Sequence, residues 1–322
     1  MNMKKWLALL LTAVLCLALL SGCGEKPVDD EPDDGQQQTD GTDSERNHTA
    51  PENTDGNLIF TFFGNLELPS ASNPQWGDCT LVTLPDGGRV LVDACEGGYE
   101  TYIVQQLKDE GVSSIDAAII SHYHTDHYGG LVTFIEEFDI RTVYIDAIEL
   151  DESLEWNTNA QGLSGYIDRL EGMGVKVVPV LAGDQAVFGE VTVDFLFPAA
   201  DTEAATTNDA SLVFTFNWKG QRALFTSDLY YAGEDICLKE VDNSLLKCDL
   251  MKIMHHGGNT SGGSEFIEVA SPKAAVAMGN HVMTDLGVYR YTKVGCEVYQ
   301  TWQTGDVNVM MDGTELTVWT QQ

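Results

Sequence analysis

Positive charge is scarce in this chain. Its 322 residues include 17 lysines and arginines against 50 aspartates and glutamates, which gives a formal net charge of −33 at neutral pH. The imbalance continues after residue 57, where 39 acidic side chains face 13 basic ones. Such a surface repels long polyanions and leaves no electrostatic footprint for nucleic acid, so the composition disfavours a processive nuclease. The same argument does not exclude a small phosphoester.

A hydrophobic run long enough to cross a bilayer is also lacking. The apolar stretch Trp6–Leu20 follows two lysines and is shorter than the roughly 20 residues that a membrane helix needs. A short basic segment, an apolar stretch and then small residues are typical of a secretory signal. The ending Leu20-Ser21-Gly22-Cys23 resembles the bacterial lipobox, which implies cleavage before Cys23 and a lipid on that cysteine. The alternatives are an ordinary signal cut elsewhere or an uncleaved anchor.

The segment after the signal has almost no apolar side chains. Residues 24–56 are mostly Asp, Glu, Gln, Thr, Pro and Gly, and such a composition cannot bury enough surface to offset its ordering entropy. We therefore expect a signal peptide at 1–22, then a lipidated cysteine with a disordered acidic tether at 23–57. Residues 58–322 are enough for one domain with a sizeable core. The protein would sit on the outer face of the cell membrane, held by the lipid on Cys23.

Cysteines are few and unevenly placed. Besides Cys16 in the signal and Cys23, the chain has Cys79, Cys95, Cys237, Cys248 and Cys296. An odd number in an exported protein predicts at least one free thiol or an intermolecular bond. Cys79 and Cys95 flank a predicted hairpin turn at residues 85–88. One hypothesis is a disulfide between them, and the other is a pair of reduced, half-buried thiols.

Apolar runs and helical spacing alternate along the domain. Strands are expected at 58–63, 79–84, 89–92, 117–121, 142–145, 176–180, 191–197, 212–218, 223–226, 250–253, 274–277, 297–301, 307–311 and 316–320. Apolar residues repeat at helical spacing over 131–138 and 163–170. Strands interleaved with helices predict an α/β fold with sheets covered by helices.

Histidine is rare, yet three of the seven histidines lie within six positions, in Ser121-His122-Tyr123-His124-Thr125-Asp126-His127. The segment follows an apolar strand and precedes a helix, so its side chains can point at a common centre. Imidazoles combined with a carboxylate suit zinc and are acceptable to manganese or iron. We expect His122 and His124 to bind one ion, and Asp126 with His127 to bind a second.

This His-x-His-x-Asp-His pattern resembles the signature of the metallo-β-lactamase fold. Its surroundings are similar to the hydrolase domain of the ComEC/Rec2 competence proteins. Further matching segments follow in order at residues 77–78, 84–88, 90–94, 208–212, 224–229, 249–258, 271–276 and 312–313. The resemblance covers nearly all of residues 58–320 and implies a four-layer αββα sandwich with the metal site at one edge of the two sheets.

The resemblance also implies roles for residues far from the histidine cluster. Asp228 would be the carboxylate that bridges two ions about 3.5–4 Å apart, which together activate a bridging hydroxide. Of the adjacent pair, His256 would bind the second ion and His255 would donate a proton or bind developing negative charge. Adjacent histidines on a loop can swap roles, so the reverse order stays open. Catalysis would then rest on Asp126, Asp228 and His255.

Three residues have weaker assignments. Asp93 is expected to orient a ligand histidine, or else to hold a hairpin end. Asn208 stands where many members of the superfamily have a further histidine, so it would contact substrate or a metal-bound water. The usual His-Pro element near the end is missing, and His281 is the nearby candidate to replace it. The alternative is that His281 is a structural or surface histidine. Ser227 stands where glycine is usual, and the insert at 65–76 is a candidate wall of the cleft.

The sequence as a whole predicts a membrane-anchored, extracytoplasmic dinuclear hydrolase. Its cofactors would be two divalent ions, most simply zinc, with manganese as the alternative. The substrate would be a small-molecule or cell-surface ester, and the resemblance favours a phosphoester over a β-lactam. Two alternatives remain: an extracellular nuclease, which the charge opposes, and a non-catalytic metal-binding surface lipoprotein, which the intact ligand set opposes.

Overall fold

The computed structural model describes residues 49–64, 77–148, 160–279 and 283–321, which belong to the unit Arg46–Gln322. The predictions for residues 1–22, Cys23, the insert at 65–76 and His281 lie outside these residues. In the part described, no helix has both the length and the apolar character needed to cross a bilayer.

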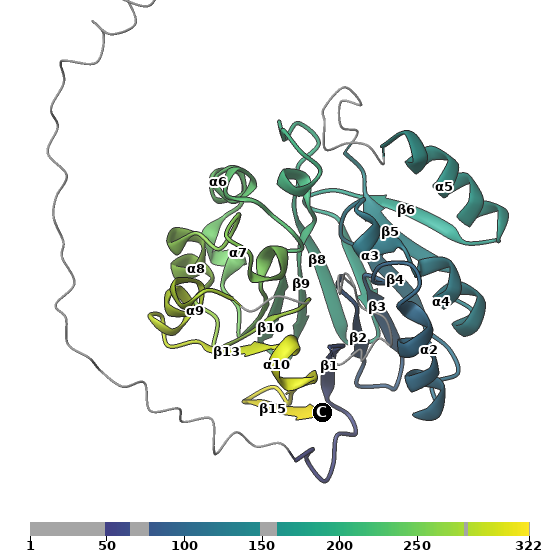
Figure 1. Cartoon of the computed structure of the whole chain (residues 1–322), viewed down its shortest axis with the longest axis horizontal. Coiled ribbons are helices and arrows are strands. Elements are labelled where there is room, and N and C mark those ends of the chain that lie inside the picture. Colours follow the sequence, from purple (N-terminus) through teal and green to yellow (C-terminus); the bar gives the residue numbers. More distant parts are fainter. Residues whose placement is uncertain (1–48, 65–76, 149–159, 280–282, 322) are drawn as a thin grey trace, which may run out of the picture. The chain divides into compact units, whose positions relative to one another are not determined.

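Two mixed sheets form the centre of the domain (Figure 1). The first has the order β15-β14-β1-β2-β3-β4-β5-β6, with parallel pairing from β3 to β6 and antiparallel pairing elsewhere. Its strands are β1 (Leu58–Phe62), β2 (Thr80–Thr83), β3 (Arg89–Val92), β4 (Ala117–Ile120), β5 (Thr142–Asp146), β6 (Lys176–Val180), β14 (Asp306–Met311) and β15 (Leu316–Gln321).

The second sheet has the order β13-β12-β11-β10-β9-β8-β7, with parallel pairing from β10 to β13. Its strands are β7 (Gln185–Phe188), β8 (Val191–Phe197), β9 (Val213–Trp218), β10 (Gln221–Phe225), β11 (Leu250–Lys252), β12 (Ala274–Ala277) and β13 (Glu297–Gln300). The parallel β10, β11 and β12 matter most for the site, because functional loops follow the first two.

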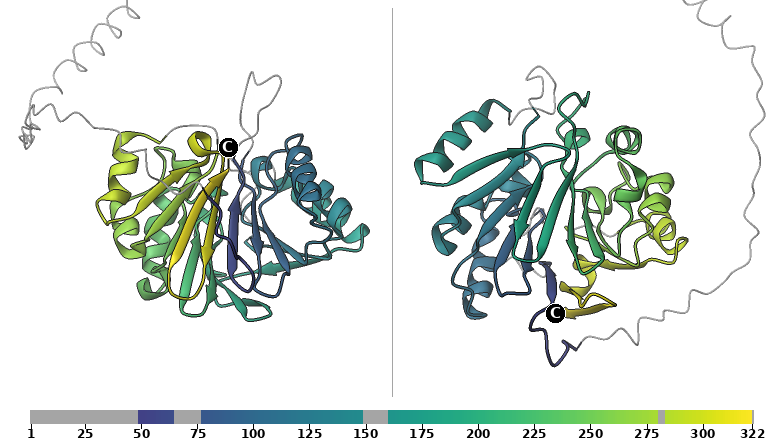
Figure 2. Two further views of the ribbon diagram at one scale, coloured as in Figure 1. Left: turned by 90° about the horizontal axis from the view of Figure 1, so that it is seen from below. Right: turned by 180° about the vertical axis from the view of Figure 1, so that it is seen from behind.

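Helices cover the outer face of each sheet (Figures 1 and 2). Those on the first sheet are α2 (Glu100–Asp109), α3 (Thr125–Tyr128), α4 (Leu131–Phe138) and α5 (Ala160–Gly172). Those on the second are α6 (Tyr231–Glu240), α7 (Asn243–Leu246), α8 (Ser264–Ala270) and α9 (Asp285–Thr292), with the short α10 (Thr301–Thr304) between β13 and β14. The predicted αββα sandwich is therefore confirmed.

The two sheets pack face to face through an aromatic core. Strand β1 alternates buried and partly exposed side chains, as does β8, so each presents one apolar face to the other sheet. Phe60 and Phe62 from the first sheet meet Phe225 from the second at ring distances of 6.0 and 6.1 Å. Phe214 stacks on Phe225 at 5.3 Å. This core fixes the two sheets against each other and thereby the loops at their shared edge.

The structure departs from the sequence predictions in some elements. Strand β7 was missed, because it is an edge strand with only one fully buried residue, Ala186. Helix α6 was missed because its buried face is carried by Gly233, Glu234 and Cys237, which gives no apolar stripe. The disulfide hypothesis is wrong for the structure, because Cys79 and Cys95 are free, buried thiols whose pKa values are raised by burial.

Buried Asp146 at the end of β5 makes one pH-dependent prediction. It is 3% exposed, and burial raises its pKa from 3.8 to about 7. An acid with a raised pKa stabilises the fold below its ordinary pKa, and that contribution is lost as the pH rises through 7. The Asp146 carboxylate accepts a hydrogen bond from the Ile148 amide at 2.8 Å. The side-chain carbonyl oxygen of the Asp146→Asn variant can accept the same bond.

We expect the free energy of unfolding of the wild-type chain to fall by about 1–3 kcal/mol relative to Asp146→Asn between pH 4 and 8. Urea unfolding at a series of pH values measures the difference. Parallel profiles for the two proteins would contradict a raised pKa at Asp146.

Candidate metal centre

Loops from both sheets meet at one edge of the sandwich. The histidine-rich segment leaves the end of β4, Asp228 follows β10, and His256 follows β11. Strands β4, β10 and β11 all have parallel neighbours, and the carboxyl ends of parallel strands are the usual place for ligand sites in such sheets. Left-handed backbone at Ser227 (φ 47°), His255 (φ 42°) and His256 (φ 57°) turns these loops sharply toward the edge.

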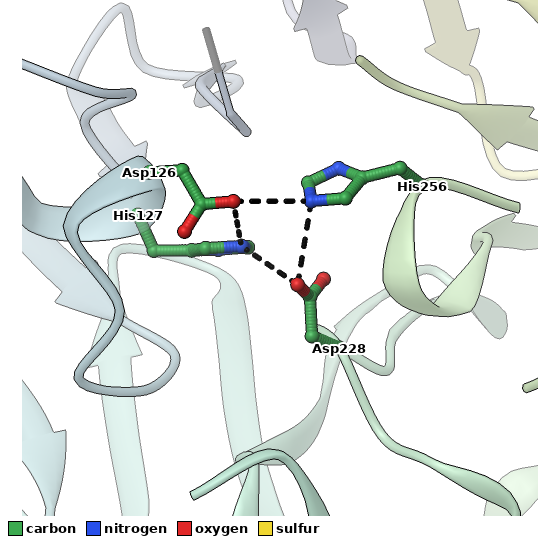
Figure 3. A group of neighbouring side chains, drawn as sticks. All are labelled: Asp126, His127, Asp228 and His256. Carbon is green, nitrogen blue, oxygen red and sulfur yellow. Dashed lines mark ion pairs between the residues drawn. The ribbon is translucent and has the colours of Figure 1, made fainter. Parts of the chain in front are cut away.

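Four side chains converge there: Asp126, His127, Asp228 and His256, with donor atoms within 4.8 Å of one another (Figure 3). The Nε2 atoms of His127 and His256 lie 3.1 and 3.3 Å from Oδ2 of Asp228. Oδ2 of Asp126 lies 3.3 Å from Nε2 of His256 and 3.8 Å from Nε2 of His127. Two imidazoles and two carboxylates thus surround one point, two from each sheet.

Carboxylates behind the two imidazoles set the direction in which they point. Nδ1 of His127 lies 2.8 Å from Oδ2 of Asp93, and Nδ1 of His256 lies 3.0 Å from Oδ1 of Asp78. Because Nδ1 is engaged in each ring, Nε2 faces the centre, which is the usual arrangement behind metal-bound histidines. Asp93 therefore contacts His127, a histidine of the predicted cluster. Asp78 was known only as part of a matching segment.

His122 and His124 form a second group beside the first. His122 is fully buried, its Nε2 lies 4.0 Å from Oδ2 of Asp228, and its ring is 4.1 Å from that of His127. The ring of His124 is 4.7 Å from that of His122. Nδ1 of His122 lies 2.9 Å from the hydroxyl of Ser227. Asp228 is therefore the carboxylate that both groups share.

The charges at the centre are strongly coupled. Burial opposes ionisation of Asp228, yet His256, His127 and Lys252 hold the pKa of this carboxyl well below its usual range. Burial likewise lowers the pKa values of His127 and His256, but Asp228 and the neighbouring carboxylates raise both well above the usual value. In His122 burial wins, and its pKa lies well below the usual value.

The donor set fits a divalent cation. The buried Nε2 atom of His122 has no hydrogen-bond partner among the described residues and lies 4.0 Å from Oδ2 of Asp228. An unsatisfied buried nitrogen costs about 1–3 kcal/mol, which a bound cation would offset. Imidazole nitrogen with carboxylate oxygen suits zinc and is acceptable to manganese.

His255 lies outside the group of four. Its ring is 5.7 Å from that of His256 and 4.8 Å from that of Tyr230, and its Nδ1 bonds to the hydroxyl of Thr260. Burial lowers the pKa of His255 to about 4, so the imidazole is neutral at pH 7. A neutral imidazole can donate one hydrogen bond and accept one proton. The geometry favours His256 over His255 as the residue facing a metal ion.

Asn208 is buried in the 3-10 turn Asn208–Ala210, with 2% exposure. Its side chain hydrogen-bonds to the hydroxyl of Tyr230, whereas its Oδ1 has no partner in the described part of the chain. Tyr230 also lies close enough to Asp228 for that carboxylate to help raise its pKa. Asn208, Tyr230 and His255 thus form one rim beside the centre.

Sequence reasoning missed Lys252, Asp78 and Tyr230. Lys252 is 2% exposed and its ammonium contacts Asp78 and Asp228. A lysine inside the apolar run Leu250-Met251-Lys252-Ile253 was the available signal, because lysine is almost never fully buried without a partner. Ser227 was noted only as a substitution for glycine. Its left-handed φ explains why glycine suits this position, and its hydroxyl supports His122.

Two curated proteins have sequences similar to this chain. The chain is 26% identical over 219 residues to ComE operon protein 3 of Bacillus subtilis (strain 168), covering 62% of this chain and 26% of that protein. It is 25% identical over 182 residues to competence protein ComA of Neisseria gonorrhoeae, covering 56% of this chain and 22% of the other. The chain thus spans about a quarter of the length of these relatives.

A mutant of the CmlA beta-hydroxylase has the same fold, with a TM-score of 0.51 and 17% identity over 82% of this chain and 55% of that one. The family model described as the metallo-beta-lactamase superfamily matches residues 75–281, which include all of the converging histidines and carboxylates. The chain therefore belongs to the metallo-β-lactamase superfamily and is a hydrolase of that superfamily related to the competence proteins.

Proposed function

We propose that the protein is a dinuclear metal-dependent phosphoesterase, held on the outer face of the cell membrane by a lipid on Cys23. The observation that carries the dinuclear part is the approach of three imidazole Nε2 atoms, from His122, His127 and His256, to the same oxygen of Asp228. A hydrogen bond or ion pair to this oxygen would need only one imidazole. Three imidazoles around it are better explained by a carboxylate that is shared between two ions.

Each half of the centre has its own proposed ion. Asp126, His127, Asp228 and His256 would hold one ion, and His122, His124 and Asp228 would hold the other. Zinc is the proposed metal, with manganese as the alternative. When bound, the ions supply positive charge that polarises the ester and lowers the pKa of water.

The protein side chains orient and stabilise. Asp93 and Asp78 keep the imidazoles of His127 and His256 turned to the centre. On the rim, the neutral His255 is placed to donate a hydrogen bond to developing negative charge or to exchange a proton with the leaving group. Asn208, whose buried carbonyl oxygen has no partner among the described residues, would contact the substrate or a water on this rim.

The phosphoester proposal rests on two observations. Curated relatives with similar sequence are competence proteins, and Asn208 replaces the histidine that many members of the superfamily have in that block. The excess of acidic residues favours a small ester over a long nucleic acid. An extracellular nuclease is the second candidate, supported by the same relatives.

The test is metal content and turnover on one sample. The chain starting after Cys23 is purified, its metal is counted, and hydrolysis of bis(p-nitrophenyl) phosphate, p-nitrophenyl phosphate, a lactone and nitrocefin is followed with zinc or manganese. Two ions per chain with phosphodiester turnover support the proposal. Metal without turnover on any ester favours the non-catalytic binding protein, and no metal uptake would rule out a metal-dependent hydrolase.

The membrane anchor is tested separately in intact cells. Labelled fatty acid should enter the wild-type protein and not Cys23→Ser. Labelling that persists in Cys23→Ser would place the lipid elsewhere or reject the lipoprotein assignment.

A substitution at Ser227 should lower the affinity for only one of the two proposed ions, the one assigned to His122, His124 and Asp228. Glycine at φ 47° is free of strain, so we expect Ser227→Gly to change the free energy of unfolding by less than about 1 kcal/mol. Loss of the hydroxyl that holds Nδ1 of His122 should weaken binding of one zinc ion roughly 10-fold. Competition with a chromogenic chelator measures the zinc affinities of the two proteins. If Ser227→Gly bound zinc as tightly as the wild-type chain, the prediction would be contradicted.

A further inference from the structure

Lys252 lies buried beneath the metal centre. It is the last residue of β11, it is 2% exposed, and strand pairing places it opposite Phe225, three residues before Asp228. A buried ammonium is costly unless it is paired and hydrogen-bonded. An apolar side chain would fill this strand position at lower cost, so the lysine calls for a reason beyond packing.

The ammonium group is fully satisfied. Its three N–H donors have three acceptors: the carbonyl of Ser227 at 2.9 Å, Oδ1 of Asp228 at 3.4 Å, and Oδ2 of Asp78 in a short contact. Ser227 reaches this position because its left-handed backbone turns the carbonyl back toward β11. The amide of His255 donates to the same carbonyl at 3.0 Å. One cation therefore joins the loops after β10 and β11.

These contacts give the two carboxylate oxygens of Asp228 different partners. Oδ1 faces Lys252, whereas Oδ2 faces the imidazoles of His127, His256 and His122 at 3.1, 3.3 and 4.0 Å. With Oδ1 engaged by the ammonium, the carboxylate cannot turn freely about its last bond. Asp228 thus presents the same oxygen to both halves of the centre.

The same cation acts on His256 through Asp78. Oδ2 of Asp78 contacts Lys252, and Oδ1 lies 3.0 Å from Nδ1 of His256. Asp78 is 2% exposed and pairs with both Lys252 and His256. A chain of contacts therefore runs from Lys252 through Asp78 to the imidazole that faces the metal position.

We propose that Lys252 is a positioning residue, which fixes the single oxygen that Asp228 presents to both ions and locks Asp78 against His256. The inference rests on the proposed metal binding. It goes beyond it by assigning the geometry of the centre to a side chain that touches neither ion. Stability alone is a weak explanation, because buried ion pairs can often be replaced by apolar side chains without loss of stability.

The test measures zinc affinity in the full chain by chelator competition, together with circular dichroism to verify folding. Lys252→Met keeps the length of the side chain and removes the charge, and we expect the affinity for zinc to fall roughly 10- to 100-fold. Lys273→Met is the matched control, since Lys273 precedes the neighbouring strand β12, is exposed, and pairs with Asp249 at 2.8 Å. Its affinity should equal that of wild type.

Asp78→Asn provides a second route, should Lys252→Met fail to fold. If the two residues act in one chain of contacts, Asp78→Asn should lose affinity similarly, and the double variant should lose less than the product of the two single effects. Wild-type affinity in folded Lys252→Met, or in Asp78→Asn when the former does not fold, would overturn the inference while leaving the proposed function intact. A wild-type chain that binds no zinc would overturn both.

Discussion

Replacing Asp228 by alanine is expected to lower kcat/KM for phosphodiester hydrolysis by at least about a thousandfold. The reason is that three imidazoles and a buried ammonium are all arranged around this one carboxylate. Its loss removes the carboxylate that the three imidazoles face, which is the proposed shared ligand, and leaves the neighbouring cations facing one another. The number of zinc ions per chain should fall in parallel with activity.

A control separates this effect from a general loss of acidic charge. Asp235 lies exposed on α6, outside the centre, and Asp235→Ala should keep wild-type activity and metal content. If Asp228→Ala kept both, Asp228 would not be the shared ligand and the proposed centre would be wrong.

Gly77→Ala is expected to destabilise the fold by at least about 3 kcal/mol and to remove bound zinc. An added Cβ at Gly77 would lie 1.6 Å from the backbone oxygen of Asp126, so the loop carrying Asp126 and His127 must move. The adjacent amide of Asp78 donates to that same oxygen at 3.0 Å, and this bond would be lost as well. Urea unfolding and metal content of the purified variant measure the two effects.

Gly87→Ala is the matched control, because Gly87 has a similar backbone (φ 88° against 67°) but no atom within 4 Å of an added Cβ. It should cost only the left-handed strain of alanine, about 1–2 kcal/mol. Equal losses in the two variants would mean that the close approach of Gly77 to Asp126 contributes nothing.

Much of the fold was predictable because it depends on local patterns. The strands show period-two alternation or short apolar runs, and the whole histidine cluster lies within residues 122–127, directly after β4. Strand β7 and helix α6 were not predictable this way, since their buried faces contain too few apolar residues. Tertiary contacts with the rest of their sheet hold them instead.

The residues of the candidate site also fall into those that local sequence patterns predict and those that they do not. His122, His124, Asp126 and His127 are close in sequence, so spacing alone brought them together. Asp228 and His256 came only from the resemblance to a family, because nothing local connects them to the cluster. The contacts of Lys252 with Asp78 join residues 174 positions apart on different sheets, and no periodicity records such a pair. Resemblance identified the segments but not the contacts between them.

The centre draws Asp126 and His127 from one sheet and Asp228 and His256 from the other. An ion bound by all four would therefore be a reversible cross-link between the two sheets. It would close the loop of about a hundred residues between Asp126 and Asp228. Ligand binding energy of this kind adds directly to folding energy, by about 2.7 kcal/mol at a metal concentration a hundred times Kd. The folded chain would then gain its final rigidity when the metal binds, so that scarcity of metal would leave the two sheets less firmly joined and more open to proteases.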